Sequence, residues 1–204
     1  LSSSSAASDV YKRQQQPSRW AEQVGGQDLV FMKNGQALLS DPASLRLWRL
    51  REGQAAQAES VPCASGVTVV PDQSRLELSD ASGRYVWSAQ IGDQGLKFMQ
   101  PYHHLHLPPA AVEVGSQASS MVMTQQGLLL VATAMGVQCC DQPGRVNLIM
   151  PLPPEALLPQ RLALGGPEGK WLVVACGTEL FARPTQLVAA QPWQPVTAAP
   201  RPRL

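Results

Sequence analysis

The segment from Pro101 to Pro108, PYHHLHLP, holds the densest group of side chains that could do chemistry, including all three histidines of the chain. In an extended strand, His104 and His106 would project to the same face, because side chains two positions apart share a face. Imidazoles placed in this way can bind one metal ion, so these two residues are the metal-ligand candidates. A zinc site needs roughly three or four ligands, and the nearest carboxylates are Asp93 and Glu113. The pattern therefore favours a solvated loop or an edge strand, and no metal or other cofactor is expected.

Familiar catalytic signatures do not occur elsewhere in the chain. The sequence has no Gly-x-Ser-x-Gly nucleophile motif and no glycine loop of the phosphate-binding or dinucleotide-binding kind. The cysteines lack the spaced pairs of a zinc site, and we interpret them as buried thiols: they are Cys63, Cys139, Cys140 and Cys176. The sequence therefore names no catalytic residue.

The composition indicates which structural elements must position these side chains. Lys and Arg number 16 against 15 Asp and Glu, and the charges are scattered, so no nucleic-acid partner is expected. The apolar runs are too short to cross a bilayer, which argues against membrane insertion. With 16 glycines, 18 prolines and 15% charged residues, the chain is typical of short strands joined by turns.

Four stretches of the sequence can be superposed as copies of one unit. Each has an apolar strand, a turn, a second strand ending in a small residue, and a third strand after another turn. The copies are Leu29–Trp48, Val67–Trp87, Met121–Cys140 and Leu162–Phe181. The second strands end at Ser40, Ser79, Ala132 and Ala175. This spacing matches the roughly 40 to 50 residues of one propeller blade.

A recurring side chain in the third strand suggests how the copies pack. It is Trp48, Trp87, Cys140 and Phe181 in the four copies. One sheet cannot bury both of its faces alone, so these side chains should pack against a neighbouring sheet. The predicted fold class is all-β, a β-propeller or partial propeller of about four four-stranded blades, with a β-sandwich as the alternative.

The predicted boundaries follow the copies. Residues 15–190 should form the blades, at about 27–63, 64–115, 116–155 and 156–190. Fourth strands are expected at 58–63, 146–150 and 187–190, and a long loop or added hairpin at about 95–115. Residues 1–14, LSSSSAASDVYKRQ, read as a translated sequencing-adaptor artefact or a disordered tail. The proline-rich residues 191–204 should form an extended tail.

The second copy resembles the tryptophan-docking repeat of quinoprotein-like propellers. That repeat has an Asp, a Ser-Gly or Thr-Gly turn and a Trp, matched here by Asp80, Ser82-Gly83 and Trp87. WD-repeat proteins are a weaker comparison, because the chain has no Trp-Asp dipeptide. The resemblance implies a propeller fold. Quinoprotein dehydrogenases also carry a disulfide between adjacent cysteines, but Cys139 and Cys140 should point to opposite faces of a strand and so not form one.

These observations favour a non-catalytic propeller scaffold for protein–protein interaction, part of a larger bacterial protein. Insertions in repeat proteins gather on binding faces, so Tyr102, His103, His104 and His106 are expected to form an interaction loop for a partner protein. A degenerate quinoprotein-like oxidoreductase and a β-sandwich of unassigned binding role are the alternatives. The sequence does not select a cellular compartment.

Overall fold

The computed structural model describes residues 19–109 and 114–193, and in them the chain forms four antiparallel sheets. The predicted artefact at 1–14 and the tail from 194 to 204 lie outside the described residues. Within the described part, η1 (Pro167–Gly169) is the only helix, and no helix there is long and apolar enough to cross a membrane. The predicted all-β fold class is confirmed.

Each sheet is built from strands that follow one another in the chain. The first sheet contains β1 (Asp28–Phe31), β2 (Ala37–Asp41), β3 (Arg46–Leu50) and β4 (Gln57–Ser60). The second contains β5 (Gly66–Val69), β6 (Arg75–Ser79), β7 (Tyr85–Gly92) and β8 (Gly95–His104). The third contains β9 (Met121–Met123), β10 (Leu129–Thr133), β11 (Gly136–Cys140) and β12 (Val146–Met150). The fourth contains β13 (Arg161–Gly165), β14 (Trp171–Cys176) and β15 (Glu179–Pro184).

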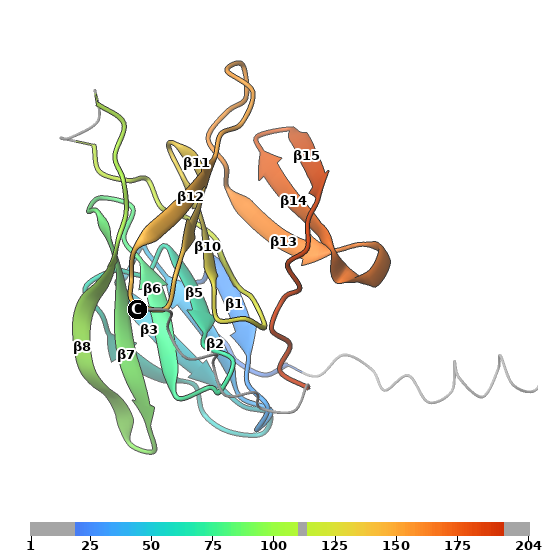
Figure 1. The fold of residues 1–204 in the computed structure, drawn as a ribbon. Helices are drawn as coiled ribbons and strands as arrows, with labels where there is room; N and C mark the ends of the chain where they lie inside the picture. The colour runs from blue at the N-terminus through green and yellow to red at the C-terminus, as the bar shows by residue number, and fades with distance from the viewer. Residues whose placement is uncertain (1–18, 110–113, 194–204) are drawn as a thin grey trace, which may run out of the picture.

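The sheets are arranged as the blades of a β-propeller, with the first strand of each sheet on the inside. Strand β1 contacts β5, β5 contacts β9, and β9 contacts β13. Figure 1 shows the sheets side by side in this order, from blue to red along the chain. The propeller is therefore built by stacking successive sheets around these inner strands, which rules out the alternative β-sandwich.

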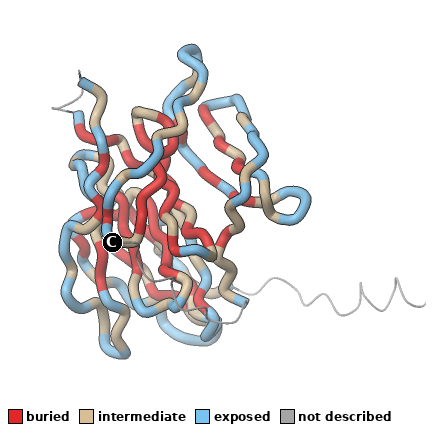
Figure 2. The backbone as a smooth tube through the Cα atoms, viewed as in Figure 1, coloured by how far each residue is buried: buried red, intermediate tan, exposed pale blue. Residues whose placement is uncertain are grey.

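Three apolar clusters fill the spaces between successive sheets. The cluster between the first and second sheets includes Leu38 and Leu76, the next includes Val86 and Leu129, and the last includes Leu130 and Leu172. A sheet between two others is covered on both faces, so every residue of β10 is buried. Figure 2 shows this central band of buried backbone, with exposed residues on the outer strands.

The recurring third-strand side chain packs toward the preceding sheet. Trp87 packs against the cluster between the first and second sheets, and Phe181 against the cluster between the third and fourth. Trp48, in the first sheet, is only partly buried, and its indole N–H donates to Asp41 at 3.5 Å. The predicted repeat is thus a packing position between sheets for Trp87 and Phe181, and Trp48 occupies the equivalent place in the first sheet.

Cys140 was wrongly assigned to this repeat position, which belongs to Gln138. Trp48 pairs with Leu39, one residue before the small residue Ser40, and Gln138 pairs with Val131, one residue before Ala132. The turn is shorter in the third sheet, where Thr133 pairs with Gly136 and only Ala134 and Met135 lie between them. Counting seven residues along the sequence therefore reaches Cys140 in this copy, two residues beyond the structurally equivalent Gln138.

The small residues at the ends of the second strands have a common structural role. The carbonyls of Ser40, Ser79, Ala132 and Ala175 accept the backbone N–H of Gln27, Ser65, Ser119 and Gln160, respectively, at 2.8, 3.1, 3.0 and 2.8 Å. Each donor belongs to the segment that enters its sheet's inner strand. The repeat therefore brings the four entry segments to the same end of the propeller.

Two predicted elements differ in the structure. The segment predicted as a loop or added hairpin from residue 95 onward begins with β8, which is the outer strand of the second sheet. The segment predicted as the fourth strand of the fourth sheet lies along β9 instead: the N–H of Ala190 donates to Met123, and the N–H of Gln125 donates to Val188. The fourth sheet therefore has three strands among the described residues.

Candidate functional site

The predicted histidine segment lies at the end of β8, and its members point to different environments. Tyr102 and His103 form an edge-on ring pair with centroids 5.0 Å apart, and His103 is buried. His104 is exposed and contacts the ring of Tyr85, with centroids 5.2 Å apart. His106 follows the strand, and Gln138 holds both its backbone N–H and its carbonyl, at 2.9 and 2.8 Å.

The metal prediction at His104 and His106 finds no third ligand in the structure. Within residues 19–109 and 114–193, no three His, Cys, Asp or Glu side chains are placed to hold a metal ion. The interaction-loop prediction for the segment is a statement about a partner and stays a prediction.

The adjacent cysteines are separate buried thiols. Cys139 belongs to the cluster between the third and fourth sheets, and Cys140 to the cluster between the second and third. Both are free, and burial raises the pKa of the Cys140 thiol to about 12. A disulfide between them would require a change of strand geometry, because they face opposite sides.

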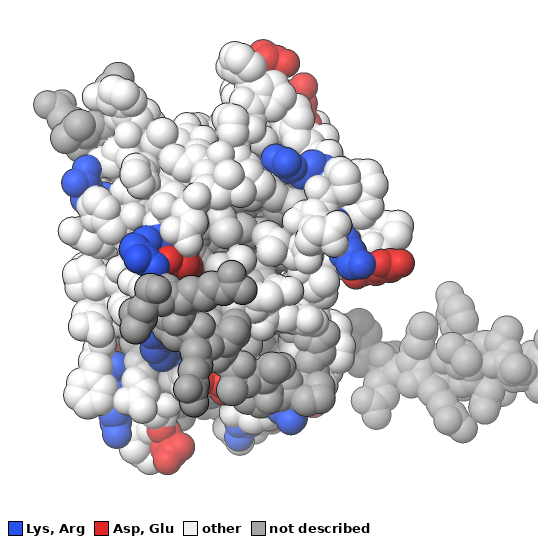
Figure 3. All heavy atoms as spheres, viewed as in Figure 1, with Lys and Arg blue, Asp and Glu red and all other residues white. Residues whose placement is uncertain are grey.

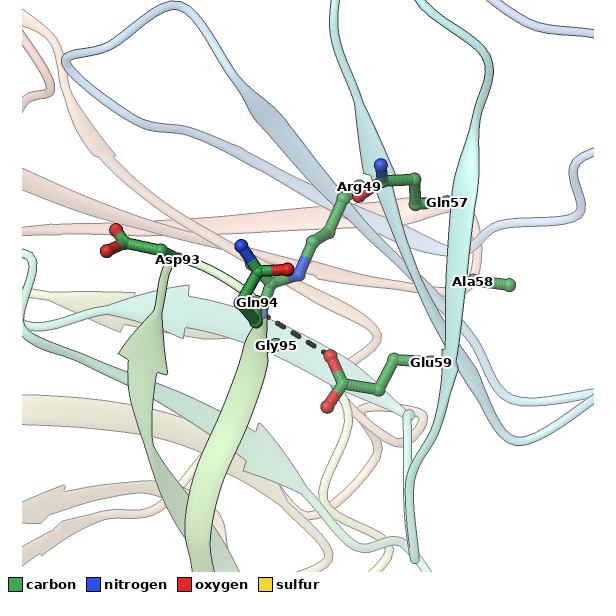
Figure 4. Close-up of a pocket in the computed structure, with 7 residues that line it drawn as sticks. All are labelled: Arg49, Gln57, Ala58, Glu59, Asp93, Gln94 and Gly95. Carbon is green, nitrogen blue, oxygen red and sulfur yellow. Dashed lines mark hydrogen bonds and ion pairs between the residues drawn. The ribbon is translucent and has the colours of Figure 1, made fainter.

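A polar cavity of about 570 Å³ lies at the outer rim, between the first and second sheets. Figure 4 shows Arg49 of β3 reaching toward Glu59 of β4 beside the turn between β7 and β8. Arg49 lies 3.4 Å from the Glu59 carboxylate and donates to the carbonyl of Gly92, while Glu59 accepts the N–H of Leu96 at 2.8 Å. Two of these contacts, Arg49 with Gly92 and Glu59 with Leu96, cross from the first sheet to the second, so we interpret them as a structural tie between the sheets.

A second cavity lies at the mouth of the propeller axis, where the inner strands begin. It has a volume of about 560 Å³ and is lined by Gly26, Gln27, Ser119, Gln160 and Arg161. Gln27, Ser119 and Gln160 are three of the entry-segment residues that the small-residue repeat holds in place. The side chains and backbone at this axial mouth therefore come from the first, third and fourth sheets.

Asp28 directly follows Gln27, a lining residue of the axial mouth, and is not itself one of the lining residues. It is the first residue of β1 and is partly buried, and its carboxylate accepts the N–H groups of Val67 and Leu29 at 3.3 and 3.2 Å. Burial raises the pKa of Asp28 above its ordinary value of 3.8, against the opposing effects of these hydrogen bonds and of Arg161. A carboxylate with a raised pKa beside a cavity is a candidate for proton transfer.

Arg161 supplies the positive charge at the axial mouth. Its guanidinium donates to the carbonyl of Gln160 and to the carbonyl of Gln27, both at 2.8 Å, and so joins the fourth sheet to the first. An arginine has five N–H groups, so others are left for an oxygen in the cavity. The charge is near enough to Asp28 to lower the pKa of that carboxyl.

Sequence reasoning missed Asp28 and Arg161 because they are far apart in the chain and belong to no motif. The available signal was the small-residue repeat, since Ser40 pairs with Asp28, Ser79 with Gly66 and Ala175 with Arg161. Figure 3 shows charged side chains dispersed over the face in view, so charge density alone does not mark a site there.

No family model matches the chain, and no curated protein matches it. Solved structures do match it. A gluconolactonase from Xanthomonas campestris is 17% identical with a TM-score of 0.68, over 84% of this chain and 61% of its own. A luciferin-regenerating enzyme is 12% identical with a TM-score of 0.61, over 80% and 64%. Regucalcin from Agrobacterium tumefaciens, a calcium-binding protein, is 11% identical with a TM-score of 0.62, over 83% and 63%.

The likeness shows that the chain has the β-propeller fold of these structures. The chain spans about three fifths of the length of these structures. The expectation of a non-catalytic scaffold is corrected, because structures with this fold include a gluconolactonase and a luciferin-regenerating enzyme. A propeller assembles its axial residues from separate sheets, so an active site on this fold needs no local catalytic motif.

Proposed function

We propose that this chain carries the active site of a hydrolase of cyclic esters at the axial mouth, with Asp28 as general base and Arg161 as the stabiliser of negative charge. The observation that carries the proposal is the Asp28 carboxyl, whose pKa is raised and which feels the charge of Arg161, directly after Gln27 in the chain. Gln27 and Arg161 both line the cavity of about 560 Å³. The shared fold with a gluconolactonase supports the choice of a lactone as substrate.

The proposed reaction balances with water as the second reactant. Asp28 takes a proton from a water molecule, whose oxygen attacks the ester carbonyl carbon. The carbonyl oxygen gains negative charge, which the Arg161 guanidinium stabilises. The tetrahedral species then collapses, the ring C–O bond breaks, and the proton on Asp28 passes to the departing alkoxide. The product is a hydroxy acid.

The geometry of the axial mouth suits a small, oxygen-rich substrate. Gln27, Ser119 and Gln160 line it with amide and hydroxyl groups, and the Arg161 side chain adds further donors. Polar groups that converge on a cavity fix the orientation of a ligand. Sugar lactones offer both the cyclic ester and several hydroxyls for these groups.

The test is acid release from a panel of five- and six-membered sugar lactones, followed at constant pH and corrected for spontaneous hydrolysis. The Asp28→Asn variant should lose about 100-fold or more of kcat/KM through loss of the base. Arg161→Gln should lose a similar factor through loss of charge stabilisation. Asp93→Asn, at the exposed outer rim, is the control and should match the unmodified chain. No hydrolysis above background, or full activity in Asp28→Asn, would refute the proposal.

A further inference from the structure

A third cavity, of about 500 Å³, opens between the second and third sheets and is lined by Arg75, Tyr102, His103 and Met123, among others. Its wall includes Val70, which follows β5, and Met123, which ends β9. The axial mouth lies where the inner strands begin, so this interblade groove opens at their opposite end.

A buried polar group lies at the base of the interblade groove. Glu77 is fully buried, and His103 is 2% exposed. The His103 Nε2 lies 3.8 Å from a Glu77 carboxylate oxygen, and both ring nitrogens of His103 lack a hydrogen-bond partner among the described residues. Burial of an imidazole without partners is unfavourable. A ligand that hydrogen-bonds to His103 would therefore gain binding free energy, because it gives the imidazole the partner that the free protein lacks.

Arg75 brings a cationic donor to the same groove. Its guanidinium lies 4.8 Å from the centre of the Tyr102 ring and 3.3 Å from the Glu77 carboxylate. The Tyr102 hydroxyl donates to the carbonyl of Gln142 at 2.9 Å, which holds the ring in place. Its contact with Glu77 is an ion pair, and the Arg75 side chain is 35% exposed, so it still lines the groove. A planar guanidinium fixed in this way is suited to a carboxylate, which it can bind through two parallel N–H groups.

The remaining walls of the groove combine apolar residues, Val70, Pro71, Met123 and Pro143, with the polar residues Asp72, Ser74 and Gln142 at its rim. Donors at one end and apolar walls around them match a ligand with an acidic head and a compact apolar body.

We propose that the interblade groove binds a small organic carboxylate with an aromatic or branched body, the carboxylate lying against Arg75 and His103. The site does not include the residues of the axial mouth. The proposal of lactone hydrolysis at the axial mouth and the proposal of carboxylate binding in the interblade groove can therefore fail independently.

The experiment uses phenylacetate as the probe and the full chain with ¹⁵N-labelled histidine. Because the chain has three histidines, each imidazole can be followed by NMR. Phenylacetate should shift the His103 ring signals saturably, with a Kd of roughly 1 mM for a ligand of this size. The signals of His104 and His106 should move far less. The neutral analogue phenylacetamide should bind about tenfold more weakly, because it lacks the charged head.

Two variants separate the site from general effects. Arg75→Gln should weaken phenylacetate binding about tenfold, whereas Arg183→Gln, the same change at an exposed position of β15, should leave it unchanged. If Arg75→Gln disturbs folding, Ser74→Trp serves instead, because it fills the mouth of the groove from an exposed position and leaves Arg75 in place. Equal binding of phenylacetamide, unchanged binding in Ser74→Trp, or no saturable shift at His103 would overturn the proposal.

Discussion

Replacing Gly66 with alanine should loosen the propeller axis. Gly66 is the first residue of β5, and its pairing partner is Ser79. A Cβ added at Gly66 would lie 2.0 Å from the carbonyl oxygen of Ser119 and 2.9 Å from the Ser79 hydroxyl. Glycine is needed here because another backbone segment approaches the inner strand closely.

The size of the effect follows from these contacts. The Ser119 segment would have to move by about 1 Å, and overpacking of this kind costs about 1–3 kcal/mol. The shift would also strain the 2.7 Å hydrogen bond from the Ser79 hydroxyl to the Ser119 carbonyl, which adds about 1 kcal/mol. We expect a loss of about 2–4 kcal/mol, or a melting temperature lower by about 5–15 °C for a domain of this size.

Thermal unfolding followed by circular dichroism measures this change. The control is Gly165→Ala at the end of β13, where an added Cβ meets nothing within 4 Å. That control should change stability by no more than about 0.5 kcal/mol. Since Ser119 lines the axial mouth, Gly66→Ala should also reduce lactone hydrolysis. The packing argument fails if the two alanine variants melt at the same temperature.

Two further predictions concern titrating groups. The pKa of Asp28 is raised above 3.8, so the unfolded chain ionises first and stability falls as pH rises from 3.8 to the raised folded value. Asp28→Asn should therefore resist urea better than the unmodified chain at about pH 7 and lose this advantage at about pH 3; equal stability at both would contradict the assignment. Burial raises the pKa of Cys63 and Cys140 to about 12, so iodoacetamide at about pH 8 should label them slowly in the folded chain and rapidly in urea. Rapid labelling before unfolding, read by mass spectrometry, would disprove this burial.

The sequence predicts the equivalent third-strand position correctly in three of the four sheets. Trp48, Trp87 and Phe181 occupy equivalent positions in their sheets. The turn between the second and third strands either keeps its length or is shortened in a way that the sequence shows. In the third copy the turn contracts, and the equivalent residue is Gln138. A fully buried glutamine does not look like a packing residue in sequence. Its side chain is satisfied by Thr133 and by the backbone of His106, which only the folded chain brings together.

The histidine segment illustrates the same limit. Sequence reasoning selected Tyr102 and His103 among its candidates but treated the segment as an insertion. In the structure these residues belong to β8, and the bulge between Val86 and Trp87 changes which side chains share a face. Glu77, which lies 3.8 Å from His103, and Arg75, which pairs with Glu77, both come from β6, and no spacing along the chain connects them to His103.

The sequence by itself determined the strands, the all-β class and the repeated sheet, because alternating apolar residues, turn residues and small strand ends are local signals that recur at each copy. The tertiary structure alone decided which side chains meet. Asp28 and Arg161 come together because the four entry segments dock at one end of the inner strands, and Glu77 meets His103 because β6 and β8 lie on either side of β7. Such contacts form when sheets that are distant in sequence stack on one another. No local sequence pattern encodes which residues that stacking brings together.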